Sequence, residues 1–198
     1  MKTAAKASDQ FPWAWFPWAE ERGVSVIYDF RGSTLPSGEI SRVETRFDLE
    51  RKAIVLASEY TSEYTAGHHF LRGVPNTPIV SFEVAKLLKS VLGVAEYQLF
   101  PVTVACLDGE LTGRYFFVRP LVSVDCVDLD KSSVEWFAPL KTFFKWESLV
   151  SCPNCLMGMS LGRDKQSRIF VVSDTVRAKL LQFDLAREYF RRLEDCNY

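Results

Sequence analysis

The chain has 198 residues, a length that suits one globular domain. Hydrophobic residues make up 47% of it and charged residues 25%, which is ordinary for a protein with a substantial core. The 24 Lys and Arg residues nearly balance the 25 Asp and Glu residues. Because binders of nucleic acid and of anionic membranes usually carry a clear excess of basic residues, we expect neither as a partner.

The N-terminus does not resemble a signal peptide. Residues 1–10 are polar, and the following FPWAWFPWA stretch contains two prolines and no long aliphatic run. No apolar stretch approaches the length of a membrane span. The five cysteines are an odd number, which favours reduced thiols over a disulfide framework. We therefore expect a cytoplasmic protein.

The first part of the chain predicts an arm followed by strands. We expect residues 1–22 to form an aromatic, partly disordered arm, extended over 11–19 because two prolines exclude a helix interior. The domain itself should cover 23–198. Strands are predicted at 24–30, at 43–49 from strict alternation, and at 53–57. The Gly- and Pro-rich segments 31–38 and 58–78 are predicted mainly as loop.

Helix signals are clearest after Ser81, which is suited to cap a first turn. An apolar stripe follows at i, i+3, i+4 and i+7 from Val84 to Val91, and Gly93 suits the stop. A second helix is predicted after Ser173, with Asp174 in its first turn. Strands are predicted at 97–105, 114–119, 121–125 and 168–172. Residues 186–193 are either a final strand, which we favour, or an extension of the helix, and 140–146 is ambiguous between strand and helix. This order predicts a single α+β domain with a mainly antiparallel sheet and a few packed helices.

Catalytic candidates are few. His68 and His69 are the two histidines of the chain, so a nucleophile–His–acid system would have to use one of them. No G-x-S-x-G, G-x-G-x-x-G or Walker sequence is present. We predict a protein that is not an enzyme and carries no catalytic residue. The alternative is an enzyme of unrecognised type that uses His68 or the pair Cys152 and Cys155.

Cys152 and Cys155 form a C-P-N-C sequence. Two thiolates at this spacing can supply half of a tetrahedral zinc site, which needs two further ligands. No second C-x-x-C exists in the chain. We expect a turn with two free thiols and no cofactor, with a zinc site as the weaker alternative.

Two segments are candidates for binding a protein partner. Asp125, Asp128 and Asp130 form an acidic cluster that is either a solvated strand end or a patch facing a basic partner. Trp13, Trp15 and Trp18 lie in the predicted arm, where they either pack into the core or serve as interface anchors.

The order of several motifs over approximately residues 75–195 resembles a bacterial polymorphic-toxin immunity family, number eleven, formerly a domain of unknown function. KLLKSVLGV is followed by EYQLFPVTV, FFVRPLVSVDCVDLDKSS and RIFVVSDTVRAKLLQFDL. The shared points are Pro101, the V-D-x-x-D-x-x-x-S run over 124–132, and a strand-to-helix step ending at Asp174. The chain departs from the family pattern at Arg119-Pro120 and in the C-P-N-C sequence.

The resemblance implies a non-enzymatic cytoplasmic antidote. Such a protein binds the toxic domain of a secreted protein encoded beside it and blocks the active site or the access of substrate. It implies a toxin domain as partner and supplies no catalytic residues. The identity of the toxin and the oligomeric state are left open.

Overall fold

A computed structural model describes residues 11–16, 24–35, 46, 53–73, 77–137, 142–183 and 189–196. Over these ranges the chain is α+β, as predicted, and most strand pairs are antiparallel. The strands form a closed barrel, a five-stranded sheet and a separate two-stranded ribbon. In the described ranges no helix is both long and apolar enough to cross a membrane.

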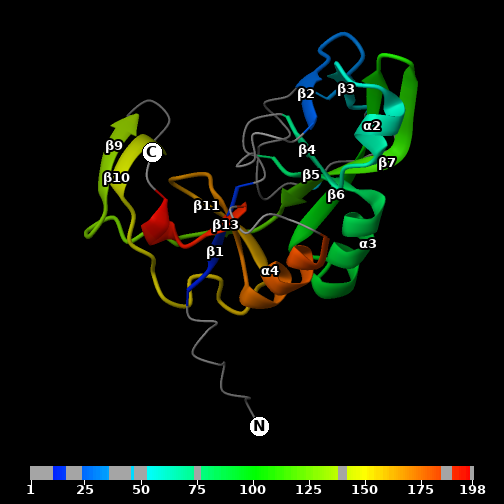
Figure 1. The fold of residues 1–198 in the computed structure, drawn as a ribbon. Helices are drawn as coiled ribbons and strands as arrows, with labels where there is room; N and C mark the ends of the chain where they lie inside the picture. The colour runs from blue at the N-terminus through cyan, green and yellow to red at the C-terminus, as the bar shows by residue number, and fades with distance from the viewer. Residues whose placement is uncertain are drawn as a thin grey trace.

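The barrel has the strand order β2-β3-β6-β7-β5-β4 and occupies the upper right of Figure 1. Its strands are β2 (Val24–Tyr28), β3 (Val55–Ser58), β4 (Phe70–Arg72), β5 (Ile79–Ser81), β6 (Tyr97–Cys106) and β7 (Gly109–Pro120). Apolar side chains such as Leu56, Phe100 and Phe117 fill the interior, as is usual for a small barrel. The inside of the barrel is therefore a packed core.

β6 and β7 form a long hairpin with a bulge. The register shifts between Val102, opposite Tyr115, and Thr103, opposite Thr112, so that Gly113 and Arg114 are the extra residues. Gly113 has a φ of 72°, a left-handed conformation that glycine adopts without the steric cost of a Cβ. The bulge turns Arg114 towards α2 (Ser62–Ala66), where its guanidinium donates to the carbonyl of Ala66 at 2.8 Å.

The five-stranded sheet has the order β13-β1-β12-β11-β8. Its strands are β1 (Trp13–Trp15), β8 (Ser123–Val124), β11 (Leu161–Asp164), β12 (Phe170–Val172) and β13 (Phe190–Arg191), and the ribbon pairs β9 (Ser133–Phe137) with β10 (Thr142–Ser148). Since β1 lies between β12 and β13, residues 13–15 of the segment expected to be an arm belong to the sheet. Of the predicted arm, residues 1–10 and 17–22 lie outside the described ranges.

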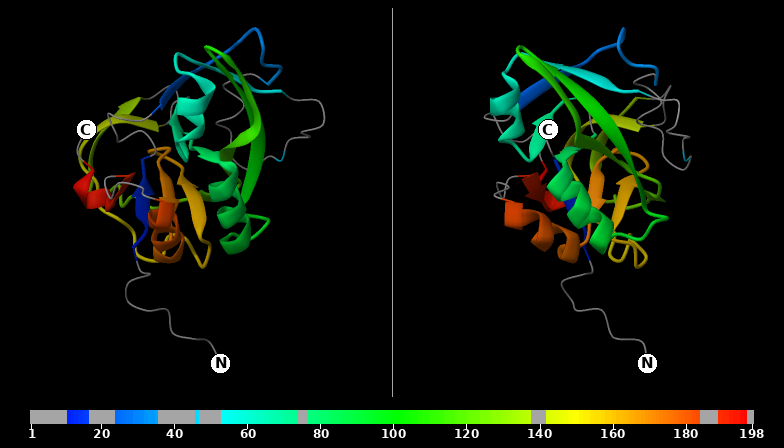
Figure 2. Two further views of the ribbon diagram at one scale, coloured as in Figure 1. Left: turned by 45° about the vertical axis from the view of Figure 1, so that its right-hand side comes forward. Right: turned by 90° about the vertical axis from the view of Figure 1, so that its right-hand side faces the viewer.

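Two helices connect the barrel to the sheet. Ser81 and Ser173 cap α3 (Phe82–Val91) and α4 (Asp174–Leu180), as predicted, each hydroxyl accepting from a backbone N–H at 3.4 Å. Short 3-10 turns follow at η3 (Leu181–Phe183) and η5 (Leu193–Asp195). One core cluster joins α3, α4, four barrel strands and four strands of the sheet. Figure 2 shows α3 and α4 beside each other below the barrel.

The prediction of loop over 58–78 was wrong at two places. α2 forms after Thr61, whose hydroxyl accepts from the N–H of Tyr64 at 3.3 Å, and β4 pairs with both β2 and β5. α2 lies at the end of the barrel farther from the five-stranded sheet in all three views (Figures 1 and 2). The strand predicted at 43–49 falls outside the described residues, apart from Arg46.

Candidate partner-binding surface

The tryptophans predicted as partner anchors belong largely to the core. Trp15 is 0% exposed, stacks on Phe190 at 6.1 Å and meets the rings of Phe70 and Phe170 edge-on at 6.4 Å. A buried ring cannot contact a partner while the domain stays folded, so of the two alternatives for Trp15 the structure favours core packing over a partner anchor. Trp18 lies outside the described residues.

Trp13 is partly buried and contacts both helix α4 and the C-terminal segment. The guanidinium groups of Arg177 and Arg192 lie over its ring, each 3.8 Å from the centroid. Its indole N–H donates to Asp174 at 2.5 Å. Cation–π contacts of this kind stabilise packing, and here they hold β1 against α4 and the segment after β13. The geometry therefore gives Trp13 a structural part.

The predicted acidic cluster contains two ion pairs. Asp125 lies 2.7 Å from Lys165, and Asp128 lies 2.7 Å from Lys131. The hydrogen bond from Lys131 is the main cause that lowers the pKa of Asp128. Asp130 is exposed. Because lysines offset two of the three carboxylates, this segment has the character of a solvated turn more than that of a strongly acidic patch.

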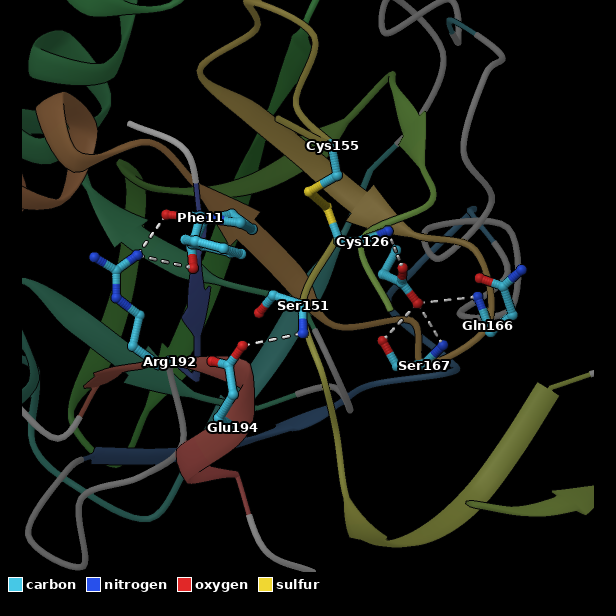
Figure 3. The surroundings of a disulfide bond; sticks show 10 residues. Phe11, Cys126, Ser151, Cys155, Gln166, Ser167, Arg192 and Glu194 are labelled. Carbon is cyan, nitrogen blue, oxygen red and sulfur yellow. Dashed lines mark hydrogen bonds between the residues drawn. A yellow bond between two sulfur atoms is a disulfide. The ribbon is translucent and has the colours of Figure 1, made fainter. Parts of the chain in front are cut away.

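The cysteines are not all free thiols, which corrects the prediction. Cys126 and Cys155 form a disulfide with their Cα atoms 5.1 Å apart, as Figure 3 shows. Cys155 is therefore not available to form a free pair with Cys152, which is partly buried. Burial, followed by the charge of Asp128, raises the pKa of Cys152. Within the described ranges, no group of three or more His, Cys, Asp or Glu residues is placed to hold a metal ion.

The segment around the disulfide is held from two sides. The N–H of Ser151 donates to Glu194 of η5 at 3.0 Å, and this bond is drawn in Figure 3. On the other side, the buried carboxylate of Asp164 accepts from the N–H of Cys126 and the N–H of Ser167, both at 2.8 Å. The loop that contains C-P-N-C therefore has a structural role, because the disulfide and these hydrogen bonds join it and its neighbours to η5 and to β11.

His69 meets two residues that could suggest catalysis. Its Nδ1 lies 2.9 Å from the hydroxyl of Ser81 and 4.0 Å from the carboxylate of Glu83. However, Ser81 is buried and caps α3, and one histidine nitrogen faces both partners. A nucleophile–His–acid set needs an accessible hydroxyl and a separate nitrogen for each neighbour. The group therefore orders the start of α3. No sequence motif indicated it, because twelve residues separate His69 from Ser81.

A group of aromatic side chains lies along α2. Tyr60 and Tyr64 stack at 5.1 Å, and the ring of His68 lies 4.9 Å from that of Tyr64. The spacing of four residues places the three rings on one side of a helical turn. Tyr64 is 49% exposed and Leu107, at the tip of the β6–β7 hairpin, is 73% exposed. The N–H of Leu107 donates to the carbonyl of Tyr60 at 3.1 Å, so the tip and the rings are neighbours.

Hydrogen bonds from the barrel hold α2 in place. Asp108 accepts from the N–H of Ser62 at 2.6 Å and from its hydroxyl at 3.2 Å. The hydroxyl of Tyr115 donates to the carbonyls of Thr65 and His68, at 2.5 and 2.8 Å. Burial raises the pKa of Tyr115 to about 12, so this hydroxyl keeps its proton over the whole physiological range. These hydrogen bonds therefore fix the position of α2, and with it the position of the aromatic rings along α2, relative to the barrel.

A hollow lies between the start of α3 and the first part of β7. It has a volume of about 380 Å³ and is lined by Phe82, Glu83 and residues 110–114. Phe82 is 51% exposed, and its ring lies 6.2 Å from that of Phe116. Arg114 lines this hollow and reaches α2 through Ala66. We call the surface made by Tyr60, Tyr64, His68, Phe82 and Leu107 the α2 face.

Sequence reasoning did not single out the α2 face, because 58–78 was predicted as loop. The spacing of Tyr60, Tyr64 and His68 was the available signal. Comparisons with models of known protein families and with curated proteins found no match to this chain. Exposed tyrosines, together with an exposed phenylalanine that lines a hollow, are suited to contact another protein.

Proposed function

We propose that this protein is an immunity protein, which binds the toxic domain of a secreted bacterial protein in the cytoplasm and neutralises it without catalysing a reaction. The α2 face is the observation that carries the proposal. Tyr64, Phe82 and Leu107 are each about half exposed or more, although burying such side chains stabilises a domain. Contact with a partner would bury them.

The sequence supports the same proposal. The motifs that resemble immunity family eleven run through β6, β7 and the strand-to-helix step at Asp174. In the structure these segments form the wall of the barrel and the junction with the sheet. They are elements of the scaffold, which agrees with a resemblance that implies no catalytic residues.

The enzyme alternative has less support. The Nδ1 of His68 lies 2.9 Å from the carbonyl of Tyr64, and Cys155 is bonded to Cys126. His68 belongs to the barrel end, whereas Cys126 and Cys155 belong to the cluster on the far side of the sheet. No observation on the described residues joins them into one reactive site.

Co-expression tests the proposal. The probe is the C-terminal domain of the secreted protein encoded by the neighbouring gene, produced in a host whose growth it arrests. We expect growth to recover when this protein is co-expressed, and the two chains to elute together in size-exclusion chromatography. Continued growth arrest with separate elution of the two folded proteins would overturn the proposal.

A further inference from the structure

Carboxylates surround the exposed rings of the α2 face. Glu59 precedes Tyr60, and Glu63 lies in the first turn of α2. Asp108 and Glu110 occupy the hairpin tip beside Leu107, and Glu83 lines the hollow next to Phe82. All five carboxylate residues are exposed: Glu59, Glu63, Glu83, Asp108 and Glu110.

Some acids outside the α2 face form ion pairs with lysines. Asp125, Asp128 and Glu135 lie 2.7, 2.7 and 3.5 Å from lysine ammonium groups. Among the residues that the structure describes, Glu59, Glu63, Asp108 and Glu110 form no ion pair with Lys or Arg. The chain as a whole has a net charge of −1, and five of its exposed carboxylate residues border the α2 face.

The basic group within the hollow is Arg114. Its guanidinium is engaged with the carbonyl of Ala66, and its charge contributes to lowering the pKa of Glu83, after the backbone hydrogen bond and the contact with Ser81. The charge of Arg114 thus acts on Glu83, which is one of the five carboxylate residues. The α2 face therefore combines apolar anchors with a negative rim.

We propose that the α2 face binds a positively charged surface of a folded protein domain, so that the neutralised toxin is recognised through its basic side. This inference rests on the proposed function. Tyr60, Tyr64, Phe82 and Leu107 supply the buried contact, and the carboxylates pair with Lys and Arg of the partner. Opposite charges across an interface mainly speed association, whereas central aromatic side chains mainly slow dissociation.

The test measures binding of the purified toxin domain of the neighbouring gene product by surface plasmon resonance, at low and high salt. The first variant combines Glu59→Gln, Glu63→Gln and Glu110→Gln; Asp108 is spared because it anchors Ser62. The matched control removes three exposed acids elsewhere, in Asp130→Asn, Glu135→Gln and Glu147→Gln. We expect the first variant to associate about 10-fold more slowly at low salt and the control less than about 2-fold.

A second variant, Tyr64→Ala, tests the aromatic contact. Truncating a central interface tyrosine typically weakens binding about 30-fold, which we expect as faster dissociation with an unchanged thermal melting temperature. If the wild-type protein binds independently of salt, and both Tyr64→Ala and the triple glutamine variant bind as the wild-type protein does, the inference is overturned and the proposed function stands. A wild-type protein that does not bind the toxin domain would overturn both.

Discussion

Alternate residues of β1 have different surroundings. Trp15 is fully buried among Phe70, Phe170 and Phe190, whereas Trp13 lies between two guanidinium groups. The sequence left core packing and partner contact open for both, because composition alone does not reveal which way a ring faces. We expect Trp15→Ala to lower the free energy of unfolding by about 3–5 kcal/mol, since it empties a large packed site.

Urea denaturation of wild type, Trp15→Ala and Trp15→Phe measures this effect. The phenylalanine variant keeps a ring in the site and should lose less stability. If Trp15→Ala cost less than about 1 kcal/mol, the ring would not have the packing role that its burial indicates. A loss of toxin binding without a loss of stability would instead favour the alternative that Trp15 is a partner anchor.

Asp108 gives a residue-scale prediction for pH. The N–H of Ser62 is the main cause that lowers the pKa of Asp108 below its ordinary value of 3.8. A carboxylate whose pKa is depressed by folding stabilises the native state above the unfolded value, and the effect is lost as pH falls through the folded value. Asp108→Ala should therefore melt below wild type at neutral pH, with the difference shrinking under acid conditions below pH 3.8. Melting curves that stay equally separated at every pH would contradict this assignment.

At the scale of elements, local signals predicted some structures and not others. α3 was predicted because Ser81 caps it and its apolar stripe is contained in ten residues. α2 and β4 have five and three residues, too short for a periodic pattern. Contacts far along the chain determine them, such as the bonds of Tyr115 to the carbonyls that end α2. Sequence periodicity does not contain that information.

The disulfide joins two segments that are distant in the sequence. Cys126 and Cys155 are 29 residues apart, and only the fold brings the loop after β8 against the turn before β11. In protein denatured without reductant, we expect three cysteines to react with iodoacetamide, namely Cys106, Cys152 and Cys196, and all five after reduction. Mass spectrometry counts the adducts. Five adducts without reductant would contradict the bond.

Reducing the disulfide should also lower stability. Closing a loop of 29 residues restricts the unfolded chain, which corresponds to about 3–4 kcal/mol in the chain-entropy model. Urea denaturation with and without reductant measures the change, and Cys126→Ala with Cys155→Ala is the matched variant that reductant should leave unaffected. Disulfides are rare in a reducing cytoplasm, so rapid alkylation of lysates tests the proposed location as well.

For the whole molecule, the sequence predicted the α+β class and a single domain, and the structure confirms both. It could not predict a closed barrel joined to a sheet, because strand pairing depends on contacts between distant segments such as β3 with β6 and β1 with β12. The acidic rim of the α2 face also depends on contacts between distant segments. A net charge of −1 gives no indication that exposed carboxylates from α2, the start of α3 and a hairpin tip border one face.

The central claim is that the protein acts by binding and not by catalysis. The most direct test adds increasing amounts of it to a fixed concentration of the active toxin domain and measures the residual toxin activity. We predict a linear fall that reaches its minimum when binding partners are equimolar, because each molecule occupies one toxin. Complete inactivation at a small fraction of that ratio, or no inhibition at any ratio, would contradict the account.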